Sequence, residues 1–220
     1  MKPYSGYLFD LDGTLVDTAP DINAALNHAL GRHGLPGFTE ALTRHWVGHG
    51  ARALIEQALA ARKRDHSTVD ALPTTESILE VFLDHYRAHI ADLGRPYPGV
   101  VTALQTLKAR GARLAVVTNK LTQLSEPLLA ALQLDLYFDA VVCGDTATAP
   151  KPAADPALHA CAALALTPAQ ALFVGDSEAD VLCARAAGCP VVVVRDGYNH
   201  GIPAAELGAD AVIESFTDLV

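Results

Sequence analysis

Two aspartates one residue apart, Asp10 and Asp12, follow a short apolar stretch and precede Gly13 and Thr14. Side chains alternate along a strand, so residues two apart point the same way and both carboxylates reach one edge of a sheet. Two carboxylates about 4 Å apart repel by about 4 kcal/mol at an effective dielectric near 20. The pair therefore indicates a neighbouring cation or chemistry that needs both acids, although a solvated turn also favours Asp and Gly.

Three later motifs offer residues that could act with this pair. Thr118 and Asn119 follow an apolar run, Asp176 follows another with Asp180 four residues later, and Lys151 lies between them before a proline. Each has an ordinary alternative, because Thr, Asn and Asp often begin helices and a lysine before proline is often a solvated loop residue. If none of the four motifs had a chemical role, all four ordinary explanations would have to be true at the same time.

In this order, the four motifs resemble those of the haloacid dehalogenase superfamily of phosphotransferases, and they span nearly the whole chain. The resemblance implies hydrolysis of phosphate monoesters through an aspartyl-phosphate on Asp10. Asp12 would first protonate the leaving alkoxide and then activate the water that hydrolyses the intermediate. Thr118, Asn119 and Lys151 would hold the transferring oxygens.

The same resemblance implies a magnesium site. Its ligands would be the side chain of Asp10, the backbone carbonyl of Asp12 and the side chain of Asp176, since Mg²⁺ prefers hard oxygen ligands. Asp180 would lie behind these ligands and orient Lys151 or a metal-bound water.

Strand and helix patterns alternate after residue 99 and predict an α/β fold with a doubly wound parallel sheet. The expected strands are 113–117, 140–142, 171–174, 191–194 and 211–213, and the expected helices are 100–110, 121–133, 156–166 and 179–187. Ligands of open α/β sheets bind outside the carboxyl ends of the strands, where Asp10, Asp12, Thr118 and Asp176 would lie.

Residues 18–93 show helix-like apolar spacing and few strand signals, and turn residues follow at 94–99. We expect a core domain of residues 1–17 and 94–220 with an inserted helical cap domain of residues 18–93. In the family that the chain resembles, such a cap is mobile, excludes water from the nucleophile and supplies specificity.

Six segments carry a closer similarity: 17–21, 47–50, 97–100, 117–120, 188–190 and 197–199. They resemble the corresponding segments of bacterial phosphoglycolate phosphatases. The resemblance implies that 2-phosphoglycolate is dephosphorylated to glycolate, with His49 and Arg52 of the cap loop as candidate partners of the substrate carboxylate.

One departure leaves the substrate open. Pro150-Lys151-Pro152-Ala153-Ala154 stands where such enzymes often read Lys-Lys-Pro-His-Pro. A phosphatase for another small phosphometabolite, such as a sugar phosphate or pyrophosphate, shares the same core motifs. A phosphomutase and a non-catalytic phospholigand-binding protein are further alternatives.

The overall composition limits the classes of partner that the protein is expected to bind. The net charge of −9 over 220 residues argues against nucleic acid, because binding to phosphate backbones draws on clustered Lys and Arg. No apolar run approaches the roughly 18 residues of a membrane helix, and no export segment is recognisable. Four cysteines without a Cys-x-x-Cys pair indicate reduced, mostly buried thiols. We expect a cytoplasmic monomer or homodimer that acts on a small phosphorylated metabolite.

Overall fold

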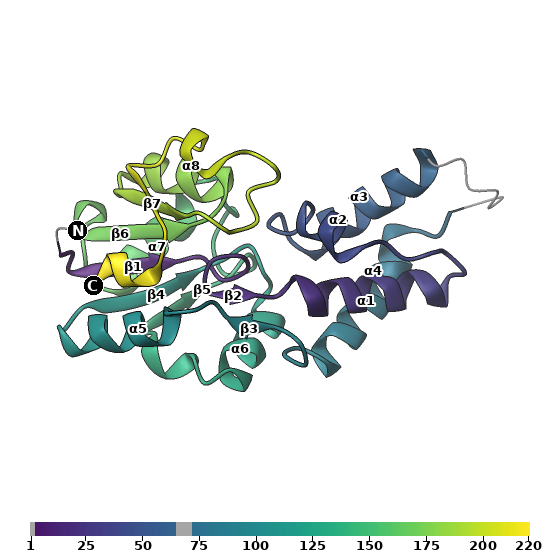
Figure 1. Cartoon of the computed structure of the whole chain (residues 1–220), viewed down its shortest axis with the longest axis horizontal. Helices are drawn as coiled ribbons and strands as arrows, with labels where there is room; N and C mark the ends of the chain where they lie inside the picture. Colours follow the sequence, from purple (N-terminus) through teal and green to yellow (C-terminus); the bar gives the residue numbers. More distant parts are fainter. Residues whose placement is uncertain (1–2, 65–71) are drawn as a thin grey trace.

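A six-stranded parallel sheet forms one of two lobes, and four helices form the other (Figure 1). The computed structural model describes residues 3–64 and 72–220. The strand order is β5-β4-β1-β6-β7-β8, so the strand that carries the paired aspartates lies inside the sheet. The strands are β1 (Gly6–Phe9), β4 (Arg113–Val117), β5 (Ala140–Val142), β6 (Ala171–Gly175), β7 (Val191–Val194) and β8 (Ala211–Ile213).

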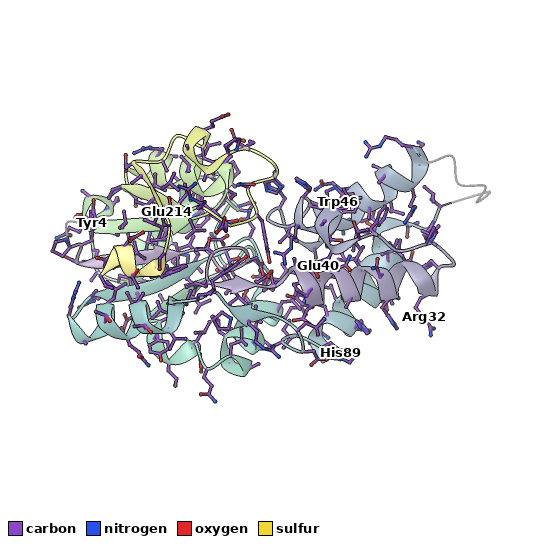
Figure 2. The ribbon with its side chains drawn as sticks, in the orientation of Figure 1. Tyr4, Arg32, Glu40, Trp46, His89 and Glu214 are labelled. Atoms are coloured by element: carbon purple, nitrogen blue, oxygen red, sulfur yellow. The ribbon has the colours of Figure 1, made fainter. Side chains whose placement is uncertain are left out.

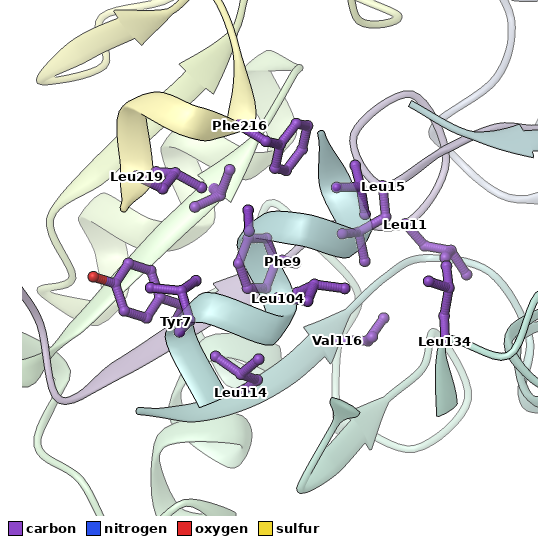
Figure 3. Close-up of a cluster of buried hydrophobic side chains, with 14 of the residues drawn as sticks. Tyr7, Phe9, Leu11, Leu15, Leu104, Leu114, Val116, Leu134, Phe216 and Leu219 are labelled. Atoms are coloured by element: carbon purple, nitrogen blue, oxygen red, sulfur yellow. The ribbon is translucent and has the colours of Figure 1, made fainter. Parts of the chain in front are cut away.

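Helices cover both faces of this sheet, which confirms the predicted doubly wound α/β fold. Alternate residues of β1 separate the two layers: Tyr7 and Phe9 belong to one buried cluster and Leu8 to the other. Figure 3 shows Phe9 in the first cluster with Leu104 and with Phe216 from the C-terminal turn. The helices are α5 (Val100–Ala109) and α6 (Thr122–Ala131) beside the first cluster, and α7 (Asp155–Ala163) and α8 (Glu178–Ala187) beside the second.

Two helices end earlier than their apolar spacing predicts. After α6 and α7 the chain turns through left-handed residues, Gln133 at φ 56° and Ala165 at φ 52°. A glycine usually marks a left-handed turn in a sequence, and neither of these positions is a glycine. Short 3₁₀ turns link other elements: η1 (Asp135–Tyr137), η2 (Pro168–Gln170), η3 (Ala204–Glu206) and η4 (Phe216–Leu219).

The second lobe consists of α1 (Ala19–Arg32), α2 (Glu40–Arg44), α3 (Ala51–Arg64) and α4 (Thr75–Ala88). Apolar residues at helical spacing, among them Leu26, Leu30, Ile55 and Phe82, form its buried cluster. Trp46 belongs to the same cluster and lies among these helices in Figure 2. Among the described residues, no helix has the length and apolar character that crossing a membrane requires.

Two short strands lie where the chain enters and leaves the helical lobe. β2 (Val16–Asp17) pairs antiparallel with β3 (Arg95–Pro96), and Asp17 lies opposite Arg95. The sequence did not predict this pair, because two-residue strands have too few positions to show an alternating pattern. The pairing sets the two connections to the helical lobe side by side.

Candidate active site

The carboxyl ends of three neighbouring strands bring the predicted residues to one edge of the sheet. Asp10 follows β1, Thr118 follows β4 and Asp176 follows β6. The backbone pairing continues past the strand ends, since the Asp10 amide donates to the carbonyl of Val174 at 2.9 Å. Asp10 is therefore held by the sheet itself and not by a loose turn.

Three carboxylates gather at this edge, and two of them share one ammonium. Asp10, Asp176 and Asp180 are buried, and each places an oxygen within 4.8 Å of the others. The Lys151 Nζ lies 2.7 Å from Asp10 Oδ1 and 2.6 Å from Asp180 Oδ1. It also donates to the Val117 carbonyl at 2.9 Å, so its three protons are all engaged.

The cluster holds three carboxyl groups and one ammonium, so negative charge on it is only partly balanced. Burial raises the pKa of Asp10 to about 7, against the opposing effect of Lys151. Burial, with the charges of Asp180 and Asp10, raises the pKa of Asp176 well above its usual value. Burial also acts against ionisation of Asp180, but Lys151 outweighs it and the pKa of Asp180 is lowered. An all-oxygen set with surplus negative charge fits a hard divalent cation, so the cluster is a candidate metal site.

The orientation of Asp176 is fixed by two segments distant in sequence. The Thr14 hydroxyl donates to Asp176 Oδ1 at 2.6 Å, and the Tyr198 amide donates to Oδ2 at 2.5 Å. Gly13 makes room for this arrangement: at φ 87°, a Cβ on it would lie 2.5 Å from Asp176 Oδ2. Sequence reasoning gave no role to Thr14 or Tyr198, and Tyr198 carries no local signal for this contact.

Asp180 lies in the first turn of helix α8 and accepts hydrogen bonds from the residues before it. Its Oδ2 accepts hydrogen bonds from the amides of Asp176 and Ser177 at 3.1 and 3.0 Å, and from the Ser177 hydroxyl at 2.7 Å. Its Oδ1 is taken by Lys151. Both oxygens are thus occupied, and the orientation of Lys151 or of a metal-bound water by Asp180 stays a prediction.

The carboxylate of Asp12 does not belong to the acid cluster and pairs with a second buried lysine. The Lys120 Nζ donates to Asp12 Oδ1 at 2.9 Å and Oδ2 at 3.2 Å, and the Thr18 hydroxyl donates to Oδ1 at 2.6 Å. Lys120 also donates to the Tyr86 hydroxyl of helix α4 at 2.8 Å. Sequence reasoning gave Lys120 and Tyr86 no role.

Asn119 links three segments through its side chain. Its Nδ2 donates to the carbonyls of Gly48 at 3.1 Å and Lys151 at 3.0 Å, and its Oδ1 accepts from the Lys151 amide at 2.8 Å. The buried Thr118 hydroxyl accepts from the amide of Lys120 at 3.1 Å. Asn119 therefore positions the backbone around Lys151, and its side chain amide is fully engaged in this conformation.

A cavity lies between the two lobes and reaches the acids. Counting the space at its mouth, it encloses about 520 Å³. The core side supplies all the charged residues, and its lining residues are Asp10, Asp12, Thr118, Asn119, Lys120, Leu121 and Leu124. The helical lobe supplies a mainly apolar wall that includes Ile22, Val47, Leu54 and Phe82, together with Tyr86.

The two predicted partners of the substrate carboxylate, His49 and Arg52, are absent from the lining of this cavity. The exposed Arg52 pairs with Glu76 at 2.8 Å. The ring of His49 stacks on His200 with centroids 5.0 Å apart, and burial together with His200 lowers the pKa of His49. Their role toward a substrate carboxylate stays a prediction.

Known proteins match the chain over most of its length. The family model of haloacid dehalogenase-like hydrolases matches residues 7–194. A phosphoglycolate phosphatase of Caulobacter vibrioides is 46% identical over 96% of this chain and 87% of its own length. One of Haemophilus influenzae is 40% identical over 96% and 95%.

Solved structures agree with these relatives. A crystal structure described as a predicted phosphoglycolate phosphatase from Haemophilus somnus is 36% identical, with a TM-score of 0.91 over 100% of this chain and 97% of that chain. CbbY from Rhodobacter sphaeroides in complex with phosphate is 26% identical, with a TM-score of 0.81 over 98% and 96%. The chain belongs to the haloacid dehalogenase-like hydrolase family.

Proposed function

We propose that this protein hydrolyses phosphate monoesters through a covalent intermediate on Asp10. The Asp10 carboxylate attacks phosphorus, the bond to the ester oxygen breaks, and Asp12 donates a proton to the leaving alkoxide. Asp12 then takes a proton from the water that attacks the aspartyl-phosphate, which releases inorganic phosphate and restores Asp10. The observation that carries this proposal is that Asp10 and Asp12 line one cavity, each paired with its own buried lysine.

The residues around Asp10 support this role. The Lys151 ammonium, 2.7 Å from Asp10, brings positive charge to the point where phosphoryl oxygens would lie. The Thr118 hydroxyl lines the same cavity and offers a donor to those oxygens. We propose that the divalent ion is Mg²⁺, held by the side chains of Asp10 and Asp176 and the carbonyl of Asp12. When bound, it supplies the positive charge that lets a carboxylate approach a phosphate dianion.

The preferred substrate in this proposal is 2-phosphoglycolate. The relatives that share 40 to 46% identity with the chain bear the name of phosphoglycolate phosphatase. The apolar wall from Ile22, Leu54 and Phe82 favours a small leaving group, because the hydroxyls of a sugar would be buried there without partners. Residues 18–93 would form the cap that selects the substrate, and residues 1–17 and 94–220 the catalytic core.

A phosphate-release screen tests the proposal. We expect Mg²⁺-dependent release from 2-phosphoglycolate with a higher kcat/KM than from hexose phosphates, nucleotides or pyrophosphate, and no release in the presence of a chelator. Faster release from a hexose phosphate or pyrophosphate would overturn the substrate assignment. Isomerised sugar without free phosphate would point to a phosphomutase, and ligand binding without turnover to a non-catalytic protein.

A further inference from the structure

The proposed reaction mechanism gives Lys120 no role beyond its ion pair with Asp12. Among the described residues that line the cavity, it is the only cationic side chain, beside the acids Asp10 and Asp12. A substrate with a second anionic group would bring that charge between the two acids and the apolar wall of the cavity, where it needs a cation. Lys151 does not line the cavity and is fully engaged beneath Asp10.

The Lys120 ammonium is held in place from both lobes. Its side chain is 5% exposed, and it contacts Asp12 of the core at 2.9 Å and Tyr86 of helix α4 at 2.8 Å. Because the lysine donates to the phenol oxygen, the hydroxyl of Tyr86 keeps its own proton for an acceptor in the cavity. An ammonium and a phenol proton side by side match the two oxygens of a carboxylate.

Distances within the substrate agree with this placement. In 2-phosphoglycolate a single methylene separates the ester oxygen from the carboxylate. Asp12 is proposed to protonate that ester oxygen, and Lys120 lies 2.9 Å from the Asp12 carboxylate. A carboxylate one carbon away from the ester oxygen is therefore within reach of Lys120, whereas Arg52 faces Glu76 outside the cavity.

We propose that Lys120 and Tyr86 recognise the substrate carboxylate and thereby determine specificity, an inference that rests on the proposed phosphatase function. When the carboxylate binds, one N–H of the Lys120 ammonium donates to the substrate in place of Asp12. Asp12 keeps its hydrogen bond from the Thr18 hydroxyl at 2.6 Å. Asp12, which protonates the leaving group, and Lys120, which binds the carboxylate of that group, are thus neighbours. Substrates without the carboxylate would leave the buried cation without its anionic partner.

The test compares two esters that differ only in this group: 2-phosphoglycolate and 2-hydroxyethyl phosphate, in which a neutral hydroxymethyl replaces the carboxylate. For Lys120→Met we expect a higher KM for 2-phosphoglycolate. The ratio of kcat/KM between the two esters should fall by at least about tenfold, because a charged hydrogen-bonding partner is lost. For Tyr86→Phe we expect a fall of about threefold, since only a neutral donor disappears.

Lys108→Met is the matched control. Lys108 also forms an ion pair, with Asp139 at 2.8 Å, but lies on the protein surface away from the cavity. This variant should keep the selectivity of the unmodified protein, and thermal unfolding should show that all three variants fold.

Three outcomes would decide against the inference or separate it from the proposed function. An equal loss of kcat/KM for both esters in Lys120→Met would mean that Lys120 acts only on Asp12, and would overturn the assignment. Should Lys120→Met fail to fold, an unchanged ratio in Tyr86→Phe would overturn it. If the unmodified protein releases phosphate from neither ester, the proposed function itself fails, which is a different result.

Discussion

The sheet edge and the helical lobe contribute to the cavity in opposite ways. The edge supplies charged groups in fixed pairs, such as Asp10 with Lys151, whose positions follow from strand ends and backbone hydrogen bonds. The helical lobe supplies apolar side chains and one phenol, Tyr86. In the proposed mechanism, the residues at the edge carry out the reaction and those at the contact between the lobes select the ester.

The largest effect should come from the nucleophile at the edge. Asp10→Asn removes the attacking carboxylate but keeps the size of the side chain, so kcat should fall by at least about 10⁴-fold while the fold remains. Phosphate release and circular dichroism measure the two quantities. Turnover equal to that of the parent protein would remove the basis of the proposed mechanism.

The second test removes the shared cation. Lys151→Met should lower kcat by about 10³-fold, because positive charge is lost where phosphoryl oxygens are held. It should also lower the free energy of unfolding by about 3–5 kcal/mol in metal-free protein, since buried carboxylates lose their partner. Denaturant unfolding of Asp10→Asn provides the comparison, because it removes a charge from the same cluster. Equal stability of the two variants would contradict the arrangement described.

The third test is the pH dependence of stability without metal. The pKa of Asp10 is about 7 in the folded protein against a usual 3.8, so between these values the folded state holds a proton that the unfolded chain has lost. Stability from this group is therefore present at low pH and decreases as pH rises toward 7. The difference in thermal midpoint between the parent and Asp10→Asn isolates this contribution, and we expect several degrees.

Metal should reverse this trend. Mg²⁺ binds ionised carboxylates, so its addition at pH 7 to 8 should raise the midpoint of the parent protein and raise that of Asp10→Asn less. A parent protein whose midpoint does not respond to Mg²⁺ would argue against the metal site.

The smallest effect should come from two exposed residues of the helical lobe, His49 and Arg52 at the start of α3. A His49→Ala, Arg52→Ala pair tests the sequence-based hypothesis for carboxylate binding. Because Arg52 pairs with Glu76 and neither residue lines the cavity, we expect selectivity between 2-phosphoglycolate and 2-hydroxyethyl phosphate to change by less than about twofold. A loss of selectivity as large as that of Lys120→Met would favour His49 and Arg52 as the partners of the substrate carboxylate instead.

The same contrast explains what could be predicted from the sequence. Strand ends place Asp10, Thr118 and Asp176 by local pattern, and the strands at 113–117, 140–142, 191–194 and 211–213 have the expected limits. Their β-branched and apolar runs are short and bounded by clear turn residues. The strands and their parallel arrangement were therefore accessible without a structure, whereas their order in the sheet was not predicted.

The contacts between lobes were not accessible in this way. Tyr86 and Lys120 are 34 residues apart and meet only because α4 packs against the core near α6. Within the sheet lobe, Tyr198 likewise reaches Asp176 from 22 residues away. Such pairs depend on tertiary packing, for which a single sequence offers no periodicity or spacing rule.

The antiparallel pairing of β2 with β3 has a consequence for how such proteins diversify. Since Asp17 lies opposite Arg95, the intervening stretch begins and ends at neighbouring points of the backbone. A different module with closely spaced termini could be grafted at this junction without redrawing the path of any strand in the six-stranded sheet. New substrate preferences could then be acquired by exchange of one continuous gene segment while the phosphoryl-transfer machinery stays in place.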